Sequence, residues 1–114
     1  MKSKHIVLAL LIFLLAACSD PLPADKLSYA GEWRSSEMLL LILEDGTVAY
    51  KRLQNGGSTS VNGPLKAFQG DSFEVGIGPF STTFEVSKPP HEVDGSWRMV
   101  VDGVLLTRMP PGGN

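Results

Sequence analysis

The only cysteine, Cys18, is the residue with the most distinctive chemistry in this chain of 114 residues. A thiol can form a disulfide, bind a metal or accept an acyl group, and its neighbours decide which of these reactions is available. One cysteine cannot form a disulfide within its own chain. The small residues Ala16 and Ala17 precede it, and the polar turn Ser19-Asp20-Pro21 follows it. A buried structural thiol does not suit this setting, so covalent modification is the stronger interpretation.

The residues that could bind a metal lack partners. His91 lies in the segment Lys88–Glu92, where two consecutive prolines predict a stiff, solvated loop. One histidine without a nearby cysteine provides too few ligands for zinc. Asp94 would add only a weak, adventitious cation site. We therefore predict no metal site and no cofactor.

The candidate catalytic side chains also have simpler explanations. Ser60 and Ser96 have no Gly-x-Ser-x-Gly elbow and no evident base. Glu74 and Glu85 could be paired carboxylates, but they fit equally well on the solvent face of two strands. Gly76-Ile77-Gly78 is not a phosphate loop, because no helix follows it. We predict no catalytic residues and no enzymatic activity, and we keep a hydrolase as the second alternative.

The first 17 residues have the pattern of a secretory signal peptide. Met1–Lys4 carries positive charge, Ile6–Leu15 is a continuous apolar run, and Ala16-Ala17 is a small-residue cleavage site. The apolar run is too short for an ordinary membrane-spanning helix, which needs about 20 residues. An uncleaved membrane anchor remains the alternative interpretation of this segment.

The sequence Leu15-Ala16-Ala17-Cys18 resembles the lipobox of bacterial lipoproteins. The resemblance covers only residues 1–18. It implies that the Cys18 thiol receives a diacylglycerol, that a peptidase cuts before it, and that the new amino group is acylated. Each buried methylene contributes about 0.8 kcal/mol, and two or more acyl chains anchor a protein stably. The first expected partner is therefore a lipid bilayer.

The same resemblance suggests a compartment. In Gram-negative lipoproteins, aspartate directly after the lipidated cysteine favours the inner membrane, whereas this chain has Ser19 there. We expect the periplasmic face of the outer membrane, with the outer face of the inner membrane as the alternative. Removal of Lys2 and Lys4 would lower Lys and Arg from 10 to 8 against 12 Asp and Glu, a formal charge of 8 − 12 = −4. An acidic domain is not expected to bind nucleic acid.

Composition divides the rest of the chain into three parts. Residues 18–28 contain two prolines and polar residues and are predicted to be a lipidated tether. Residues 29–109 are predicted to form one small domain. Residues 110–114, Pro-Pro-Gly-Gly-Asn, are predicted to be a flexible tail.

Turn signals through residues 29–109 recur at the spacing of an all-β domain. Asp45-Gly46 and Asp102-Gly103 each separate two apolar segments, which is a strong hairpin signal. Further turns are predicted at Asn55-Gly56-Gly57, Asn62-Gly63-Pro64 and Gln69-Gly70-Asp71. We predict a small antiparallel meander or a reduced barrel.

Alternation of apolar and polar residues predicts which side chains share a face. The expected sets are Phe73, Val75 and Ile77; Phe80, Thr82, Phe84 and Val86; and Trp97, Met99 and Val101. The unbroken apolar run Leu39–Leu43 predicts a strand buried on both faces.

Gly31-Glu32-Trp33 on the opening strand, with an arginine on the closing strand, resembles the lipocalin family and its smaller relatives. The resemblance implies that Trp33 closes one end of a barrel and that Arg108, or alternatively Arg98, packs over it in a cation–π contact.

The aromatic residues are the remaining candidates for a binding site. Trp33, Trp97, Phe73, Phe80 and Phe84 form either the core or an apolar groove. We expect a non-enzymatic envelope module that binds a protein partner or a small apolar ligand. The alternative is a small inhibitor of a wall-degrading enzyme, which would use a protruding loop such as Lys88–Glu92.

Overall fold

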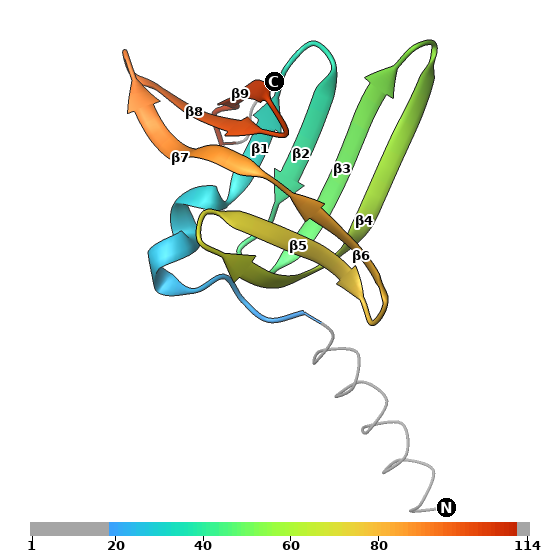
Figure 1. Cartoon of the computed structure of the whole chain (residues 1–114). Helices are drawn as coiled ribbons and strands as arrows, with labels where there is room; N and C mark the ends of the chain where they lie inside the picture. The colour runs from blue at the N-terminus through green and yellow to red at the C-terminus, as the bar shows by residue number, and fades with distance from the viewer. Residues whose placement is uncertain (1–18, 112–114) are drawn as a thin grey trace, which may run out of the picture.

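The computed structural model describes residues 19–111, and within this range it contains one short helix and nine strands (Figure 1). The helix is the 3₁₀ segment η1, Ala24–Tyr29. The strands are β1 Gly31–Arg34, β2 Met38–Ile42, β3 Thr47–Gln54, β4 Gly57–Gln69, β5 Ser72–Ile77, β6 Phe80–Phe84, β7 Val86–Val93, β8 Ser96–Val101 and β9 Val104–Arg108. The predicted all-β class is confirmed. The predicted signal peptide, Cys18 and residues 112–114 lie outside the described residues.

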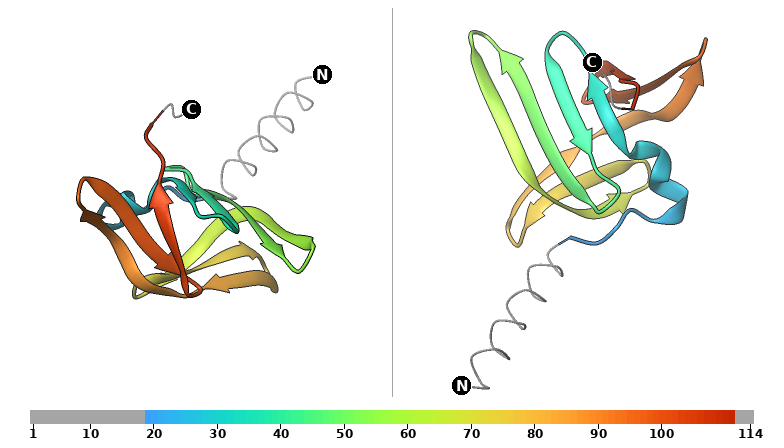
Figure 2. Two further views of the ribbon diagram at one scale, coloured as in Figure 1. Left: turned by 90° about the horizontal axis from the view of Figure 1, so that it is seen from above. Right: turned by 180° about the vertical axis from the view of Figure 1, so that it is seen from behind.

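The strands form one antiparallel sheet in the order β6-β5-β4-β3-β2-β1-β9-β8-β7. Apart from β6 and β7, strands that follow one another in the chain are neighbours in the sheet. The first and last strands also pair, with Trp33 opposite Arg108. Only Glu85 separates β6 from β7, so one segment forms both ends of the sheet. The sheet curls toward itself (Figures 1 and 2), which is the predicted meander rolled into a partial barrel. No helix within residues 19–111 is long and apolar enough to cross a membrane.

Tight hairpins arise where an Asn or Asp precedes glycine and both residues adopt positive φ. The φ angles are 49° and 80° at Asn55-Gly56, 50° and 82° at Asp94-Gly95, and 49° and 79° at Asp102-Gly103. This is the type I′ pattern, whose twist matches that of the paired strands. The turn predicted at Asp102-Gly103 is confirmed, with Val101 and Val104 paired on either side of it.

The Asp45-Gly46 turn has a different geometry, because only Gly46 has a positive φ, of 91°. The loop is wider, and the Leu43 N–H donates to the Thr47 carbonyl oxygen at 2.9 Å. The Asp45 carboxylate accepts a hydrogen bond from the Thr47 N–H at 2.9 Å, and hydrogen bonding from Thr47 lowers the pKa of Asp45. The side chain of Asp45 therefore adds a hydrogen bond to a turn that also has backbone hydrogen bonds.

The turn predicted at Asn62-Gly63-Pro64 is wrong, because these residues lie inside the long strand β4. Pro64 stands opposite Thr47 and Gly63 opposite Val48 in the pairing with β3. From Leu65 onward β4 pairs with β5 instead, with a register shift between Leu65 and Ala67. The Gly-Pro pair thus lies where the strand changes partner, and not where the chain reverses.

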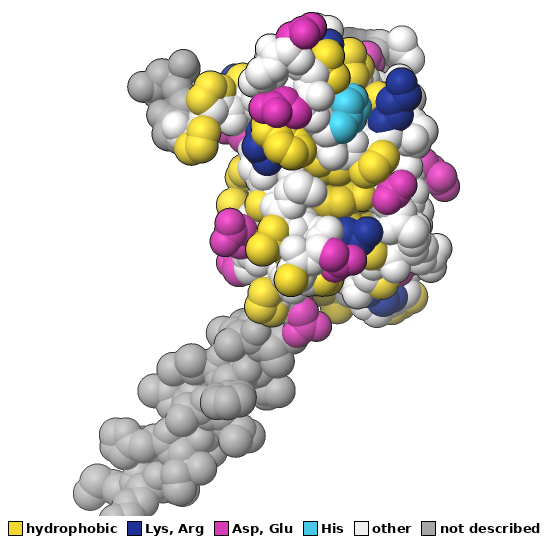
Figure 3. Space-filling view, turned by 90° about the vertical axis from the view of Figure 1, so that its left-hand side faces the viewer, with side chains coloured by type: hydrophobic (Ala, Val, Ile, Leu, Met, Phe, Trp, Pro, Cys, Tyr) yellow, Lys and Arg dark blue, Asp and Glu magenta, His cyan; other side chains and the backbone are white. Residues whose placement is uncertain are grey.

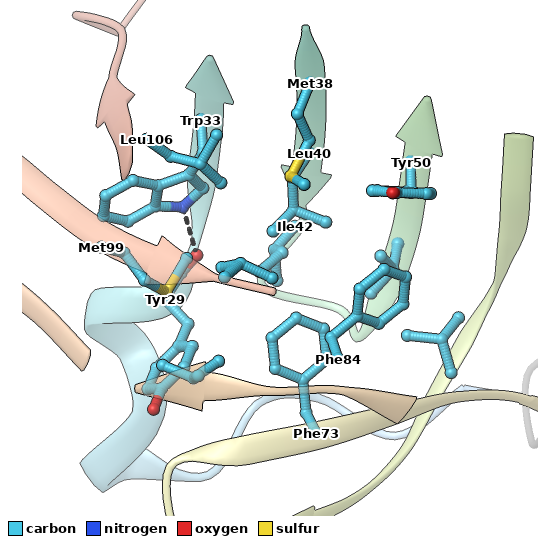
Figure 4. Close-up of a cluster of buried hydrophobic side chains, with 14 of the residues drawn as sticks. Tyr29, Trp33, Met38, Leu40, Ile42, Tyr50, Phe73, Phe84, Met99 and Leu106 are labelled. Carbon is cyan, nitrogen blue, oxygen red and sulfur yellow. Dashed lines mark hydrogen bonds between the residues drawn. The ribbon is translucent and has the colours of Figure 1, made fainter. Parts of the chain in front are cut away.

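The inner face of the curled sheet carries the hydrophobic core (Figure 4). In β2, alternation buries Met38, Leu40 and Ile42. Phe73 and Phe84 stack with ring centroids 5.2 Å apart. The largest side chains with less than 2% exposure are Trp33, Phe73, Phe84, Leu40, Ile42, Met99, Leu106, Val48, Val75 and Val101. Each fully buried side chain of this kind contributes about 1.5–3 kcal/mol.

Tyr29 ties η1 to the rest of the sheet. Its backbone carbonyl accepts a hydrogen bond from the Trp33 indole N–H at 2.9 Å, shown as a dashed line in Figure 4. Its hydroxyl donates to the carbonyl oxygen of Asp71 at 2.8 Å. Burial, with a smaller contribution from the Asp71 charge, raises the pKa of Tyr29 to about 12.

The segment before η1 packs on the sheet, although residues 18–28 are predicted to be a tether. Leu22 is 6% exposed and belongs to the core, and its N–H donates to the Glu44 carbonyl oxygen at 2.9 Å. Gly46 has no room for a side chain, because the Asp20 carbonyl lies against its Cα. Within the described residues, this segment therefore packs against the domain already at Asp20.

Candidate functional site

The aromatic candidates divide into core residues and one exposed residue. Trp33 is 0% exposed, and Phe73 and Phe84 are each 1% exposed, so these three are core. Trp97 is partly buried and packs against the core. Phe80 is 84% exposed, although alternation predicts that it shares the inner face with Phe84. Of the five aromatic candidates, Phe80 is the one with a largely exposed side chain.

Arg108 lies between the two tryptophans. Its guanidinium carbon is 4.8 Å from the ring centroid of Trp97 and 5.6 Å from that of Trp33, within the range of cation–π contacts. A Cβ at Gly31 would lie 2.7 Å from the Arg108 Cδ, so glycine leaves room for this arginine. Arg108, and not Arg98, makes the contact that the lipocalin resemblance implies. The guanidinium therefore packs against both rings.

His91 is in strand β7, so the loop predicted for Lys88–Glu92 is wrong. The register shifts twice along β7, and the second shift, between Lys88 and His91, contains Pro89 and Pro90; His91 then pairs with Arg98. An edge strand tolerates proline because its outer N–H groups have no partner in the sheet. The face that carries β7 shows charges of both signs around the histidine (Figure 3). The His91 Nδ1 lies 2.9 Å from the Pro89 carbonyl oxygen, which is a local contact and not a site.

Of the candidate acidic residues, Glu74 has a structural partner for its carboxylate, and Glu85 is held through its backbone. Glu74 accepts a hydrogen bond from the Ser81 hydroxyl at 2.8 Å, which links β5 to β6. The Glu85 N–H donates to the Asp102 carboxylate at 2.9 Å, and the Asp102 N–H donates back to the Glu85 carbonyl at 2.8 Å. Between residues 19 and 111, no group of three or more His, Cys, Asp or Glu side chains could hold a metal ion.

The outer face of β2 is the most distinctive uncovered surface. The prediction that Leu39–Leu43 is buried on both faces is wrong, because only the inner face is covered. Leu39 is 36% exposed, Leu43 is 42% exposed, and Leu41 is partly exposed. Leu53 of β3, 54% exposed, has the same orientation. We call Leu39, Leu41, Leu43 and Leu53 the leucine face.

Charged residues border the leucine face. The register places Leu39 between Arg34 and Lys51. It places Leu41 between Glu32 and Ala49, and Glu32 forms an ion pair with Arg34. An apolar centre with a charged, solvated rim is the usual anatomy of a protein–protein interface.

Two shallow clefts flank the leucine face. One has a volume of about 280 Å³ and is lined in part by Leu39, Leu53 and Lys51. The other has a volume of about 580 Å³ and is lined in part by Leu27, Leu41 and Met109. Sequence reasoning overlooked this site, because it read the Leu39–Leu43 run as a fully buried strand. The sequence does contain a signal for this site, because a strand that is apolar at every position needs to be covered on both faces.

Comparisons with known proteins gave no match to a family model, to a curated protein or to a solved structure.

Proposed function

We propose that this chain is a lipid-anchored envelope protein whose β domain is a non-enzymatic module that binds a protein partner through the leucine face. Acylated Cys18 holds it in the outer membrane, facing the periplasm, with the outer face of the inner membrane as the alternative. The lipobox resemblance supports the anchor, and Ser19 in place of aspartate supports the outer membrane.

The partial exposure of the leucine face carries the proposal. The sequence supplies an apolar residue at every position from Met38 to Leu43, yet the domain covers only alternate ones. Covering the exposed parts of four leucines would contribute about 3 kcal/mol to binding. Contiguous apolar surface with a polar rim marks interaction sites, whereas isolated exposed leucines do not.

A protein partner suits this surface better than a small apolar ligand. Small-ligand sites are concave and enclose most of the ligand, and both clefts beside the leucine face are shallow and open. The alternative of an inhibitor depends on a protruding loop at Lys88–Glu92. This segment belongs to strand β7, so the alternative lacks that loop.

A photocrosslinking amino acid at position 39 is expected to capture one defined envelope protein in living cells. The matched control is position 87, because Ser87 is exposed but lies on β7, four strands away from β2 in the sheet. The crosslink should appear at position 39 alone. Equal capture at both positions, or capture only of a second copy of this chain, would contradict the proposed heterologous partner.

Leu39→Gln separates binding from stability. Because Leu39 is partly exposed, the substitution should change the free energy of unfolding by about 1 kcal/mol or less. It should nevertheless abolish crosslinking from a probe placed at position 53. Leu105→Gln is the control, since Leu105 is 50% exposed on β9 and lies outside the leucine face. If both variants crosslink like the wild type, the leucine face is not the binding surface.

A further inference from the structure

The tip of the β5–β6 hairpin is a second exposed apolar feature. Gly78, with φ of 58°, and Pro79 form a two-residue turn of the type II′ pattern between Ile77 and Phe80. Ile77 is 66% exposed and Phe80 is 84% exposed. They are register partners, so their side chains lie beside each other on one face of the hairpin.

The tip is held in a defined conformation. Pro79 fixes its own φ, and the Lys66 ammonium donates to the Gly78 carbonyl oxygen at 3.0 Å. Beside the tip, β4 diverges from β5 and leaves a hollow of about 650 Å³. Its lining includes Val61, Val75 and Phe80 and no charged residue. Two large apolar side chains thus stand at the rim of an uncharged hollow, and neither is covered by residues 19–111.

The tip lies at the end of the domain where the described chain begins. Asp20 packs against Gly46, and the Gly46 carbonyl accepts a hydrogen bond from the Leu65 N–H at 2.7 Å. Leu65 is the register partner of Val75, two residues before Ile77. These steps place the tip within roughly 20 Å of Gly46. Figure 1 and the view from behind in Figure 2 show the hairpin turn and the start of the described chain at the same end.

The chain between the proposed anchor and the packed domain is short. Asp20 follows Cys18 by two residues, which span at most about 7 Å. A domain acylated at Cys18 therefore stays close to the bilayer, with the end that carries the hairpin tip nearest to it. Ile77 and Phe80 lie within reach of the lipid surface, and a partner in solution would have to compete with that surface.

We infer that the hairpin tip, residues 77–80, is a second, peripheral membrane contact that orients the anchored domain. This inference rests on the lipid anchor of the proposed function. The tip itself is apolar. Lys66 donates a hydrogen bond to it, whereas Asp20, Glu44 and Asp45 carry negative charge at the end of the domain where the described chain begins. The contact should therefore withstand high salt, unlike one made by a basic patch.

The test uses the acylated, full-length mature protein in vesicles of phosphatidylethanolamine with a minority of anionic phosphatidylglycerol. The fluorophore NBD is attached to a cysteine at position 77, and to one at position 53 as the control. NBD at position 77 should shift to the blue and be quenched by lipids that carry a nitroxide in the acyl chain. NBD at position 53 should show neither effect. Phe80→Ser should lower the quenching at position 77 to the level of position 53, and 1 M salt, at which the Debye length is about 3 Å, should leave the wild-type signal unchanged.

The outcomes separate this inference from the anchor itself. Intact mass first establishes acylation of Cys18, and without it the proposed anchor fails before the tip is tested. If the protein is acylated and position 77 is quenched no more than position 53, the tip does not contact the membrane. A blue shift at position 77 that is already present without vesicles would also overturn the inference, because protein would then be covering the tip.

Discussion

Trp33→Ala is expected to lower the free energy of unfolding by about 3–5 kcal/mol, the usual cost of removing a large aromatic side chain from a core. Trp33 is 0% exposed, its indole N–H bonds to Tyr29, and Arg108 packs over its ring. A domain of this size has a total stability of about 5–15 kcal/mol, so the loss removes a large share of it. Urea unfolding followed by circular dichroism measures the change.

Trp97→Ala is the matched control, because it removes the same side chain from the other side of Arg108. Trp97 is only partly buried, so its loss should be clearly smaller than that of Trp33. Equal effects would mean that the cation–π stack, and not burial of Trp33, stabilises this end of the sheet. A Trp33→Ala variant within about 1 kcal/mol of the wild type would contradict the described core.

Gly76→Ala is expected to disrupt the β5–β6 hairpin and to cost about 3 kcal/mol or more, through backbone strain and steric collision. The φ angle of 144° at Gly76 is one that side-chain-bearing residues rarely adopt. An added Cβ would collide with the Phe80 carbonyl and would lie 2.6 Å from the Ser81 Cα, so the opposite strand would have to move. Loss of hydrogen-exchange protection in β5 and β6 should accompany the loss of stability.

Gly70→Ala isolates the conformational part of this effect. Gly70 also has a positive φ, of 63°, but nothing lies within 4 Å of a Cβ placed there. This variant should lose only about 1 kcal/mol, the usual strain of a left-handed residue. If Gly76→Ala is no more destabilising than Gly70→Ala, the close approach of the two strands at Gly76 is not present in solution.

The all-β class was predictable because local signals agreed with one another. Asp102-Gly103 and Asn55-Gly56 form the predicted turns. Both pairs adopt the positive φ angles that a tight hairpin turn requires, whatever the surrounding structure. Asn62-Gly63-Pro64 has the same local appearance but lies within β4, because pairing with β3 overrides the turn preference. Local chemistry alone does not distinguish a reversal of the chain from a strand that changes partner.

Burial was less predictable, because it depends on how the sheet curls. Alternation correctly places Phe73 and Val75 on the inner face, yet Ile77 and Phe80 continue that face beyond the region that other strands cover. Leu22 shows the opposite case. Prolines on either side of it suggest a tether, yet its side chain is buried in the core and its N–H bonds to Glu44. The alternation of apolar and polar residues along a strand predicts neither the exposure of Ile77 and Phe80 nor the burial of Leu22.

The candidate site was only partly predictable for a related reason. Aromatic residues are common candidates for binding groups, but Trp33, Phe73 and Phe84 fill the core. The domain is too small to leave a deep cavity. Leu39 and Leu41 of β2 were predicted to be core and are partly exposed. Whether an outer-face leucine is core or interface depends on whether another layer covers that face. The sequence of this chain alone does not show whether such a layer is present.

The lipid anchor is tested most directly by intact mass and membrane fractionation of the expressed protein beside Cys18→Ala. The account predicts that the wild type lacks residues 1–17, carries added acyl mass and sediments with the outer membrane. The variant should have no acyl mass and should leave that fraction. If both proteins have the same unacylated mass and the same distribution, Cys18 is not an anchor. The envelope address and the membrane contact of the hairpin tip would then both be wrong.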